Sequence, residues 1–265
     1  MPVFLPKRGR RNLLDGLALD APYVTEIRRL LQNLYRQEKG AQAERRSYMV
    51  TSAARGEGKS TICTLMAILS ARIFHKRTLL LDGDLHRPTI HSLLGVSRAP
   101  GLIEILRERA DVREATHATS LPFLWVIPSG YPRDGISESY ADERFGRVLQ
   151  GLRAGYDVVF VDAPPSVPTI EPTLMAEHVD ALLLVAMAGR TPLAMVRRSM
   201  QILRPVEDKI VGVVLNNAVD GLPYYFNYRY YGYEESKTPR TRRSVPPRRP
   251  EPKAGARTKD TRGGS

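Results

Sequence analysis

Residues 52–61, which read SAARGEGKST, decide the fold of this chain. An apolar, β-prone run, 48–51, precedes them, and a second apolar run, 62–66, follows them. The pattern predicts a strand, a glycine-containing loop and the first turn of a helix. Backbone N–H groups and the positive end of a helix dipole bind phosphate at such a junction, and a lysine and a hydroxyl complete a site for a triphosphate with magnesium. The sequence therefore predicts a P-loop.

This stretch departs from the pattern G-x-x-x-x-G-K-[ST] at one position, because Ala53 stands where the first glycine is usual. A chance Gly-Lys-Ser sequence in an ordinary turn is the alternative interpretation. In the P-loop interpretation Lys59 supplies the cation, and Ser60 or Thr61 supplies the hydroxyl. The residues of this stretch that we expect to contact the nucleotide are Arg55, Gly56, Glu57, Gly58, Lys59, Ser60 and Thr61.

Length and composition indicate a globular protein. The 265 residues are enough for one large or two small domains, and 42% of them are hydrophobic. No apolar run approaches the roughly 20 residues that a membrane span requires. The N-terminal residues are basic but lack an apolar stretch with a cleavage site, so we expect no secretory signal and a cytoplasmic location.

Most of the positive charge lies at the C-terminal end. Residues 236–265 contain ten Lys or Arg and two acidic residues, which accounts for +8 of the net charge of +12. The rest of the chain is close to neutral for its size, so the charge does not predict nucleic-acid binding by the folded part. Because this tail has almost no apolar residues, we expect it to be disordered. It is either a solvated tail or a contact for anionic lipid, nucleic acid or an acidic partner.

Strands and helices alternate along the middle of the chain. A helix is predicted from Pro22, where apolar residues recur three and four apart. Six strands with crossover helices predict one doubly wound, mainly parallel α/β domain, which binds ligands at the C-terminal ends of its strands. The expected strands are 48–52, 77–82, 123–127, 157–161, 181–186 and 210–215, and the expected helices between them are 61–74, 89–94, 101–109, 139–153, 171–177 and 192–203.

Two of these strands end in acidic residues. Asp82 and Asp84 follow the apolar run 78–81, and Asp162 follows the run 158–161. A helix cap or an Asp-Gly turn would explain one such segment. An acid at the end of a four-residue apolar strand is also the form of a Walker B segment, whose Asp meets magnesium. Together with the P-loop, the two acidic segments predict a nucleotide site with magnesium.

At this point the motifs resemble a known family. SAARGEGKST, LLLDGDLHRP and VVFVDAPPS, in this order, are similar to the Walker A, Walker A′ and Walker B segments of the bacterial tyrosine kinases (BY-kinases) of capsule and exopolysaccharide synthesis. The resemblance covers roughly residues 22–235. It implies a P-loop ATPase of the deviant-Walker type with ATP and Mg²⁺ as cofactors. It also implies that Asn216, at the end of the last strand, lies near the adenine.

The resemblance also implies residue roles. Lys59 and the backbone of 55–60 would hold the phosphates, and Ser60, Asp84 and Asp162 would hold the magnesium. Asp82 would accept the proton of the acceptor tyrosine. The choice between Asp82 and Asp84 for these roles rests on the resemblance and not on spacing. The catalytic set is therefore Lys59, Asp82, Asp84 and Asp162.

Six of the twelve tyrosines lie within ten residues near the end of the folded part. The segment does not alternate as a buried strand would, and burying six phenols would require a partner for each hydroxyl. In the family a C-terminal tyrosine cluster is the autophosphorylation substrate, and an aromatic docking or nucleic-acid stacking segment is the alternative. We expect acceptors from a neighbouring subunit, since the cluster follows the far end of the chain. The expected acceptors are Tyr224, Tyr225, Tyr228, Tyr230, Tyr231 and Tyr233.

The chain departs from the family pattern in two places. The second motif usually reads D-x-D-x-R, whereas His86 occupies the arginine position and Arg87 comes one residue later. The predicted N-terminal helix resembles the E-x-x-R-x-x-R element of ring assembly, with Glu26 and Arg29 in place and Gln32 instead of the last arginine. We expect homo-oligomers through Glu26 and Arg29. The neutral side chain of Gln32 affects this assembly and not the binding of ATP.

The expected organisation follows from these observations. A flexible basic N-terminus (1–21) precedes a kinase domain (22–222), which a tyrosine cluster (223–235) and a basic tail (236–265) follow. The chain resembles the stand-alone kinases, which work at the inner face of the plasma membrane with a separate transmembrane activator and are reversed by a tyrosine phosphatase. Two alternatives remain: a positioning or partition ATPase, whose signature lysine is replaced here by Ala54, and a nucleotide-binding adaptor without catalysis.

Overall fold

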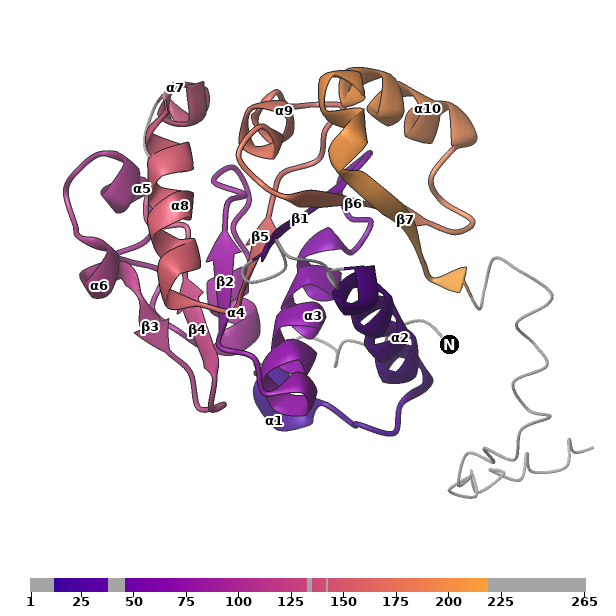
Figure 1. Cartoon of the computed structure of the whole chain (residues 1–265). Coiled ribbons are helices and arrows are strands. Elements are labelled where there is room, and N and C mark those ends of the chain that lie inside the picture. Colours follow the sequence, from indigo (N-terminus) through magenta and orange to yellow (C-terminus); the bar gives the residue numbers. More distant parts are fainter. Residues whose placement is uncertain (1–11, 38–45, 133–134, 142, 219–265) are drawn as a thin grey trace, which may run out of the picture. The chain divides into compact units, whose positions relative to one another are not determined.

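A sheet of seven strands forms the centre of the structure, a computed structural model that describes residues 12–37, 46–132, 135–141 and 143–218 (Figure 1). The strand order is β3-β4-β2-β5-β1-β6-β7, and all neighbouring strands are parallel except β3 and β4. The predicted doubly wound, mainly parallel α/β fold is therefore confirmed. The strands are β1 (Arg46–Ser52), β2 (Thr78–Asp82), β3 (His117–Ala118), β4 (Leu124–Ile127), β5 (Val158–Asp162), β6 (Ala181–Met187) and β7 (Ile210–Asn216).

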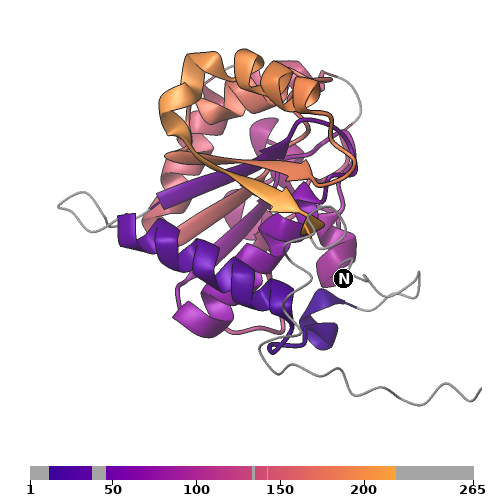
Figure 2. The same cartoon turned by 90° about the vertical axis from the view of Figure 1, so that its right-hand side faces the viewer.

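Helices cover both faces of the sheet. In Figure 2 the indigo and violet helices α2 and α3 lie below the sheet and the orange helix α10 lies above it. No helix in the described ranges is long and apolar enough to cross a bilayer. The helices are α1 (Leu13–Gly16), α2 (Pro22–Gln37), α3 (Lys59–Phe74), α4 (Ile90–Leu94), α5 (Leu102–Leu106), α6 (Val112–Ala115), α7 (Ile136–Ala141), α8 (Arg144–Gly155), α9 (Glu171–Ala176) and α10 (Leu193–Ile202), with a 3₁₀ helix η1 (Arg204–Lys209).

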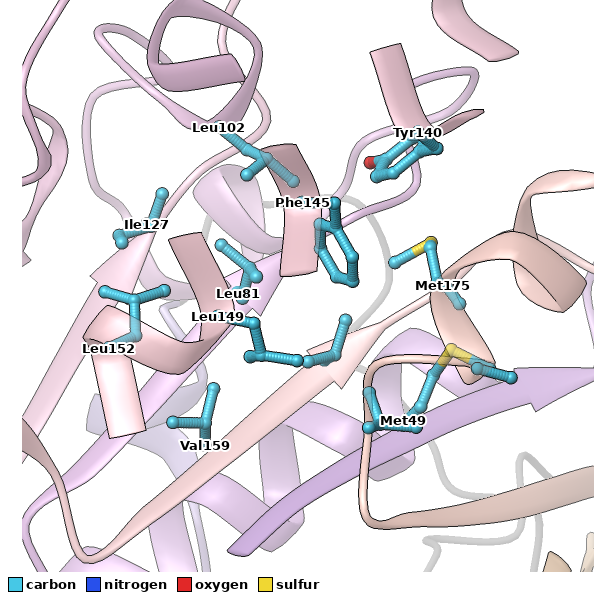
Figure 3. Close-up of a cluster of buried hydrophobic side chains, with 14 of the residues drawn as sticks. Met49, Leu81, Leu102, Ile127, Tyr140, Phe145, Leu149, Leu152, Val159 and Met175 are labelled. Atoms are coloured by element: carbon cyan, nitrogen blue, oxygen red, sulfur yellow. The ribbon is translucent and has the colours of Figure 1, made fainter. Parts of the chain in front are cut away.

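The central strands are buried on both faces, which explains their continuous apolar sequence. Successive residues of β1 enter opposite cores: Met49 packs with α8 and α9, whereas Tyr48 and Val50 pack with α2 and α3. Figure 3 shows the first core, where Phe145 lies between the sheet and Tyr140. The central strands are packed between these two cores, and the residues at their ends are therefore fixed by the packing of the sheet.

The structure differs from the sequence-based expectation in three elements. It has a seventh strand, β3, because two residues pair antiparallel with the edge strand β4, which is too short a pairing to recognise in sequence. The helix expected at 139–153 is two helices, α7 and α8. Their Tyr140 and Phe145 rings meet at 5.4 Å between centroids in one core, and residues five apart on a single continuous helix would face different directions.

The third difference lies before Pro22, where the sequence predicted a flexible segment. Residues Leu13–Gly16 form the short helix α1, and the Asn12 side chain accepts a hydrogen bond from the Leu14 N–H at 3.0 Å. Leu13 and Leu14 pack against the core between α2, α3 and the sheet. Part of the expected lead-in therefore belongs to the folded unit.

Candidate active site

The P-loop lies where β1 ends and α3 begins, at the centre of the sheet. Gly58 adopts a left-handed conformation with φ of 91°, and helix α3 starts at the next residue. The buried Glu57 carboxylate accepts a hydrogen bond from the Ala54 N–H at 2.8 Å, which curls the loop. The backbone N–H groups at the start of α3 therefore lie where the predicted P-loop requires them for binding phosphate.

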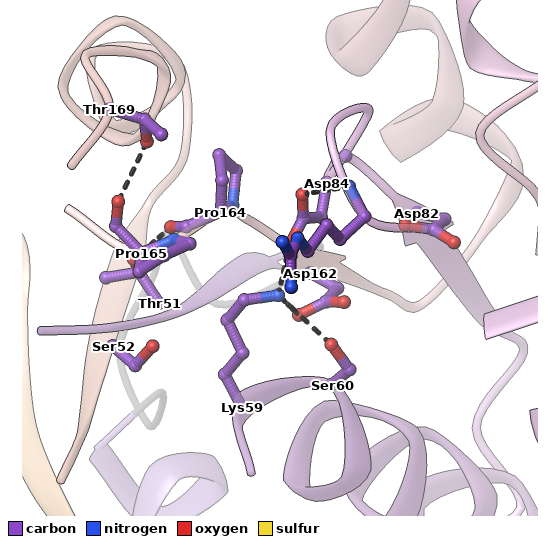
Figure 4. A network of polar contacts seen from close by, with 12 residues as sticks. Thr51, Ser52, Lys59, Ser60, Asp82, Asp84, Asp162, Pro164, Pro165 and Thr169 are labelled. Atoms are coloured by element: carbon purple, nitrogen blue, oxygen red, sulfur yellow. Dashed lines mark hydrogen bonds and ion pairs between the residues drawn. The ribbon is translucent and has the colours of Figure 1, made fainter. Parts of the chain in front are cut away.

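Lys59 connects the P-loop to the two acidic strand ends (Figure 4). Its Nζ lies 2.7 Å from Asp84 Oδ2, 3.4 Å from Asp162 Oδ1 and 3.1 Å from Ser60 Oγ. Burial alone would lower the pKa of Lys59, but the carboxylates of Asp162 and Asp84 outweigh burial and raise it. Lys59 is therefore a permanent cation at the point where the P-loop meets β2 and β5.

The two strand-end carboxylates lie side by side, because Asp82 of β2 and Asp162 of β5 are register partners. Both side chains are fully buried. Burial and the negative charge of Asp162 raise the pKa of Asp82 well above its usual value, and burial raises the pKa of Asp162 against the opposing effect of Lys59. Asp82 Oδ2 accepts a hydrogen bond from the Ile90 N–H at 3.2 Å.

A pocket of about 320 Å³ opens above this charge cluster. The P-loop forms one wall, and residues that follow β2 and β5 form the other walls. Asp84 lines the pocket, whereas Asp82 and Asp162 lie beneath its surface. The lining residues are Arg55, Gly56, Gly58, Lys59, Ser60, Thr61, Asp84, His86, Arg87, Thr89, Leu93, Pro164, Pro165 and Thr169.

The oxygen atoms around Lys59 fit a magnesium ion bound with a nucleotide. Asp162 Oδ2 and Asp82 Oδ1 are buried and have no hydrogen-bond partner among the described residues. In the same part of the chain, no three His, Cys, Asp or Glu side chains form a complete metal site. Magnesium beside a triphosphate takes only one or two carboxylates and the phosphate oxygens, so Ser60, Asp84 and Asp162 are a sufficient set.

Comparisons with known proteins agree with this geometry. No protein-family model matches the chain. Tyrosine-protein kinase wzc of Salmonella typhi is 30% identical over 193 residues, which are 73% of this chain and 27% of that protein. Tyrosine-protein kinase YwqD of Bacillus subtilis (strain 168) is 28% identical over 191 residues, which are 72% of this chain and 79% of YwqD. The solved kinase domain of Escherichia coli tyrosine kinase ETK superimposes with a TM-score of 0.71 and 27% identity over 82% of this chain and 87% of that chain.

These kinases and the solved kinase domain are BY-kinases, so the chain resembles the BY-kinase family both in sequence and in fold. The predicted resemblance is thus confirmed, although the chain spans only about a quarter of the Salmonella protein. McdA of Cyanothece also superimposes, with a TM-score of 0.55 and 22% identity. At that identity the likeness shows a shared fold alone.

Three residues hold the P-loop from outside: Asn216 ends β7, and Arg190 and Thr191 follow β6. Asn216 Nδ2 donates to the Glu57 carbonyl oxygen at 2.9 Å, Thr191 Oγ1 donates to the Glu57 carboxylate, and Arg190 donates to the Gly56 carbonyl oxygen at 3.3 Å. Asn216 was expected near the nucleotide and lies against the P-loop. Arg190 and Thr191 were not predicted, since nothing in the sequence between β6 and α10 indicates a contact over more than 130 residues.

The structure also shows a polar cluster that the sequence did not predict. His86 Nε2 lies 2.9 Å from Glu171 Oε1, and Ser137 Oγ donates to the same oxygen at 2.6 Å. Next to it, the buried Tyr140 hydroxyl donates to the Gly83 carbonyl oxygen at 2.9 Å. His86 was recognised only as a departure from the family motif, and its partners come from α7 and α9.

The remaining predicted residues lie away from the pocket or outside the described ranges. Glu26 and Arg29 form an ion pair of 2.7 Å along α2, with side chains that are 45% and 61% exposed. The pair is accessible for assembly, as the prediction requires. All six predicted acceptor tyrosines and the basic tail lie outside the described residues.

Proposed function

We propose that this chain is an ATP-dependent protein-tyrosine kinase that phosphorylates its own tyrosine cluster, 224–233. The observation that carries the proposal is the convergence of the P-loop, Lys59, Asp84 and Asp162 in a chain related to proteins named tyrosine-protein kinases. Phosphoryl transfer requires mainly positioning and cancellation of negative charge, and this site offers both.

The roles of the site residues follow from their positions. The P-loop N–H groups bind the β- and γ-phosphates, and Lys59 neutralises the oxygens of the transferred group. Ser60, Asp84 and Asp162 would hold Mg²⁺, which when bound supplies further positive charge to the phosphates. We retain Asp82 as the acceptor of the phenolic proton, since its raised pKa favours proton uptake. Because Asp82 is fully buried, this role requires the residues above it to move, and Asp84 is the alternative acceptor.

The position of Asn216 changes the argument about where the acceptor comes from. The sequence argument placed the cluster at the far end of the chain, but Asn216 contacts the P-loop of its own subunit at 2.9 Å. Tyr224 follows eight residues later, and an extended chain spans at most roughly 29 Å over that length. The tether alone therefore does not require a neighbouring subunit. The proposal keeps transfer in trans, which assembly through α2 would allow.

A mixing experiment tests both the activity and its mode. One chain carries Lys59→Met with all tyrosines, and the other carries intact Lys59 with the six cluster tyrosines changed to Phe. With ATP and Mg²⁺, transfer in trans places phosphate on the Lys59→Met chain, as located by mass spectrometry. Phosphate found only when Lys59 and the tyrosines share one chain would indicate transfer in cis. Hydrolysis of ATP with no phosphotyrosine in any mixture would instead support a switch ATPase, and ATP binding without either reaction would support an adaptor.

The physiological setting belongs to the same proposal. A BY-kinase of this kind would regulate exopolysaccharide or capsule synthesis or export together with a transmembrane activator, at the inner face of the membrane, and a phosphatase would reverse it. The tail 236–265 would add contact with anionic lipid. Adding the cytoplasmic part of a candidate activator to the assay above tests this setting, and an unchanged rate of phosphorylation for every candidate would contradict it.

A further inference from the structure

We infer that His86 and Glu171 act as a positioning pair that fixes Asp84 against Lys59 and thereby makes nucleotide binding responsive to magnesium. The inference rests on the proposed nucleotide site, but not on which group receives the phosphate. It concerns residues 83–88, which we call the 83–88 turn and which connect β2 to α4.

The 83–88 turn has little regular structure of its own. Its first residue, Gly83, donates its backbone N–H to the carbonyl oxygen of Asp162, at the end of β5, at 2.8 Å. Asp84 is held at one oxygen by Lys59 Nζ at 2.7 Å and at the other by the Arg87 N–H at 2.9 Å. The second of these bonds lies inside the turn, so it positions Asp84 only if the turn itself is held in place.

The His86 ring supplies that hold on the pocket side. Its Nε2 lies 2.9 Å from Glu171 Oε1, and Glu171 opens α9, which follows the loop after β5. Burial would raise the pKa of Glu171, but the hydrogen bonds from Ser137 and His86 outweigh it and keep the pKa low. Since an ionised carboxylate only accepts hydrogen bonds, the His86 Nε2 must carry a hydrogen and donate. The pair therefore connects the turn that carries Asp84 to the segment that follows Asp162.

The second oxygen of Glu171 predicts what an arginine would do at position 86, where the family usually has one. Glu171 is 1% exposed, and its Oε2 has no partner among the described residues. A guanidinium can bind both oxygens of a carboxylate, whereas an imidazole nitrogen binds one. His86→Arg is therefore expected to use both oxygens and to keep the turn in place. Arg87, whose side chain is exposed, contributes its backbone N–H to Asp84 instead.

Two matched variants separate positioning from simple packing. The side-chain nitrogen of Gln reaches about as far as His Nε2, so His86→Gln retains a donor for Glu171, whereas the shorter side chain of His86→Asn does not reach it. We expect the gain in affinity for a fluorescent ATP analogue on adding Mg²⁺ to fall about tenfold in His86→Asn, as is typical for lost outer-shell partners, and to stay within about twofold of the original in His86→Gln and His86→Arg. Because His86 lines the pocket, affinity without Mg²⁺ is measured for each variant in parallel, and the effect of Mg²⁺ is taken as the ratio of the two affinities.

Ser137→Ala is the control, since it removes a donor from the same Glu171 oxygen without touching the turn. It should leave the effect of Mg²⁺ within about twofold of the original value. The thermal midpoint of each variant shows whether it is folded, and the binding assay needs no tyrosine phosphorylation, so failure of the kinase proposal leaves this test valid. Equal loss in His86→Asn and His86→Gln, or no loss in either, would overturn the inference.

Discussion

The P-loop and the 83–88 turn meet at Lys59, but they are held in different ways. The P-loop takes its shape mainly from neighbours in sequence: Glu57 accepts from Ala54, and Gly58 supplies the left-handed residue before α3. The 83–88 turn is held by Tyr140 and Glu171, which are 57 and 85 residues away from their partners in the turn. The comparison teaches that the P-loop has a locally formed backbone, which distant side chains then brace, whereas the shape of the 83–88 turn depends on the whole fold.

The largest effect is expected at the residue that both halves share. Lys59→Met should reduce tyrosine phosphorylation by about a thousandfold or more, because the transferred phosphoryl group loses its neutralising cation. The measurement is the initial rate of phosphate incorporation with ATP and Mg²⁺. Lys59→Arg, which keeps the charge but not the compact ammonium, is the control and should retain more activity than Lys59→Met. A Lys59→Met chain that retained more than a tenth of the rate would show that the cation is dispensable.

A glycine variant tests the backbone conformation of the P-loop. The φ of +91° at Gly58 strains any residue with a Cβ, and a Cβ there would also displace the Asn216 side chain, whose Nδ2 would lie 2.2 Å away. Gly58→Ala should therefore lower the free energy of unfolding by about 1–3 kcal/mol and weaken nucleotide binding. The matched control is Gly151→Ala in α8, where nothing lies within 4 Å, and it should stabilise the protein by about 0.5–1 kcal/mol. Denaturant unfolding measures both, and equal effects would contradict the assignment of Gly58.

The carboxylates beneath the pocket predict a pH dependence of stability. Since the pKa of Asp82 is raised in the folded state, its contribution to stability is fully present below the unfolded-state pKa of about 4 and is lost as the pH rises toward the folded-state value. Asp82→Asn removes this loss, so the variant should be more stable than the original protein at pH 7.5 and gain less on acidification. Thermal midpoints between pH 4.5 and 8 measure it. A variant that is less stable at pH 7.5 would mean that the Asp82 carboxylate is stabilised as an anion.

These expectations show what the sequence could and could not predict. The P-loop, the acidic strand ends and the parallel sheet could be predicted because each is written in neighbouring residues or in apolar runs. The positions of His86, Glu171 and Tyr140 could not, because their contacts join segments that only the complete fold brings together. The split between α7 and α8 was missed for the same reason: the requirement that Tyr140 and Phe145 enter one core is invisible in helical periodicity.

The smallest effect is expected at Arg190, the exposed contact of the P-loop. Its bond to the Gly56 carbonyl oxygen is 3.3 Å long and open to water, so Arg190→Ala should change the free energy of unfolding by less than about 0.5 kcal/mol. Glu57→Ala is the buried counterpart, and it should cost about 1–3 kcal/mol because it leaves the Ala54 N–H without its acceptor. Denaturant unfolding and nucleotide titration measure both variants.

The two readouts of Arg190→Ala carry different information. If the P-loop is shaped locally, water replaces the guanidinium at the Gly56 carbonyl and nucleotide affinity changes by less than about threefold. A larger loss of affinity without a loss of stability would mean that Arg190 leaves Gly56 to contact the nucleotide itself. Asn216 and Thr191 brace the P-loop in either case, but nucleotide binding by the P-loop would then also require a distant side chain, and the contrast between the two halves of the site would weaken.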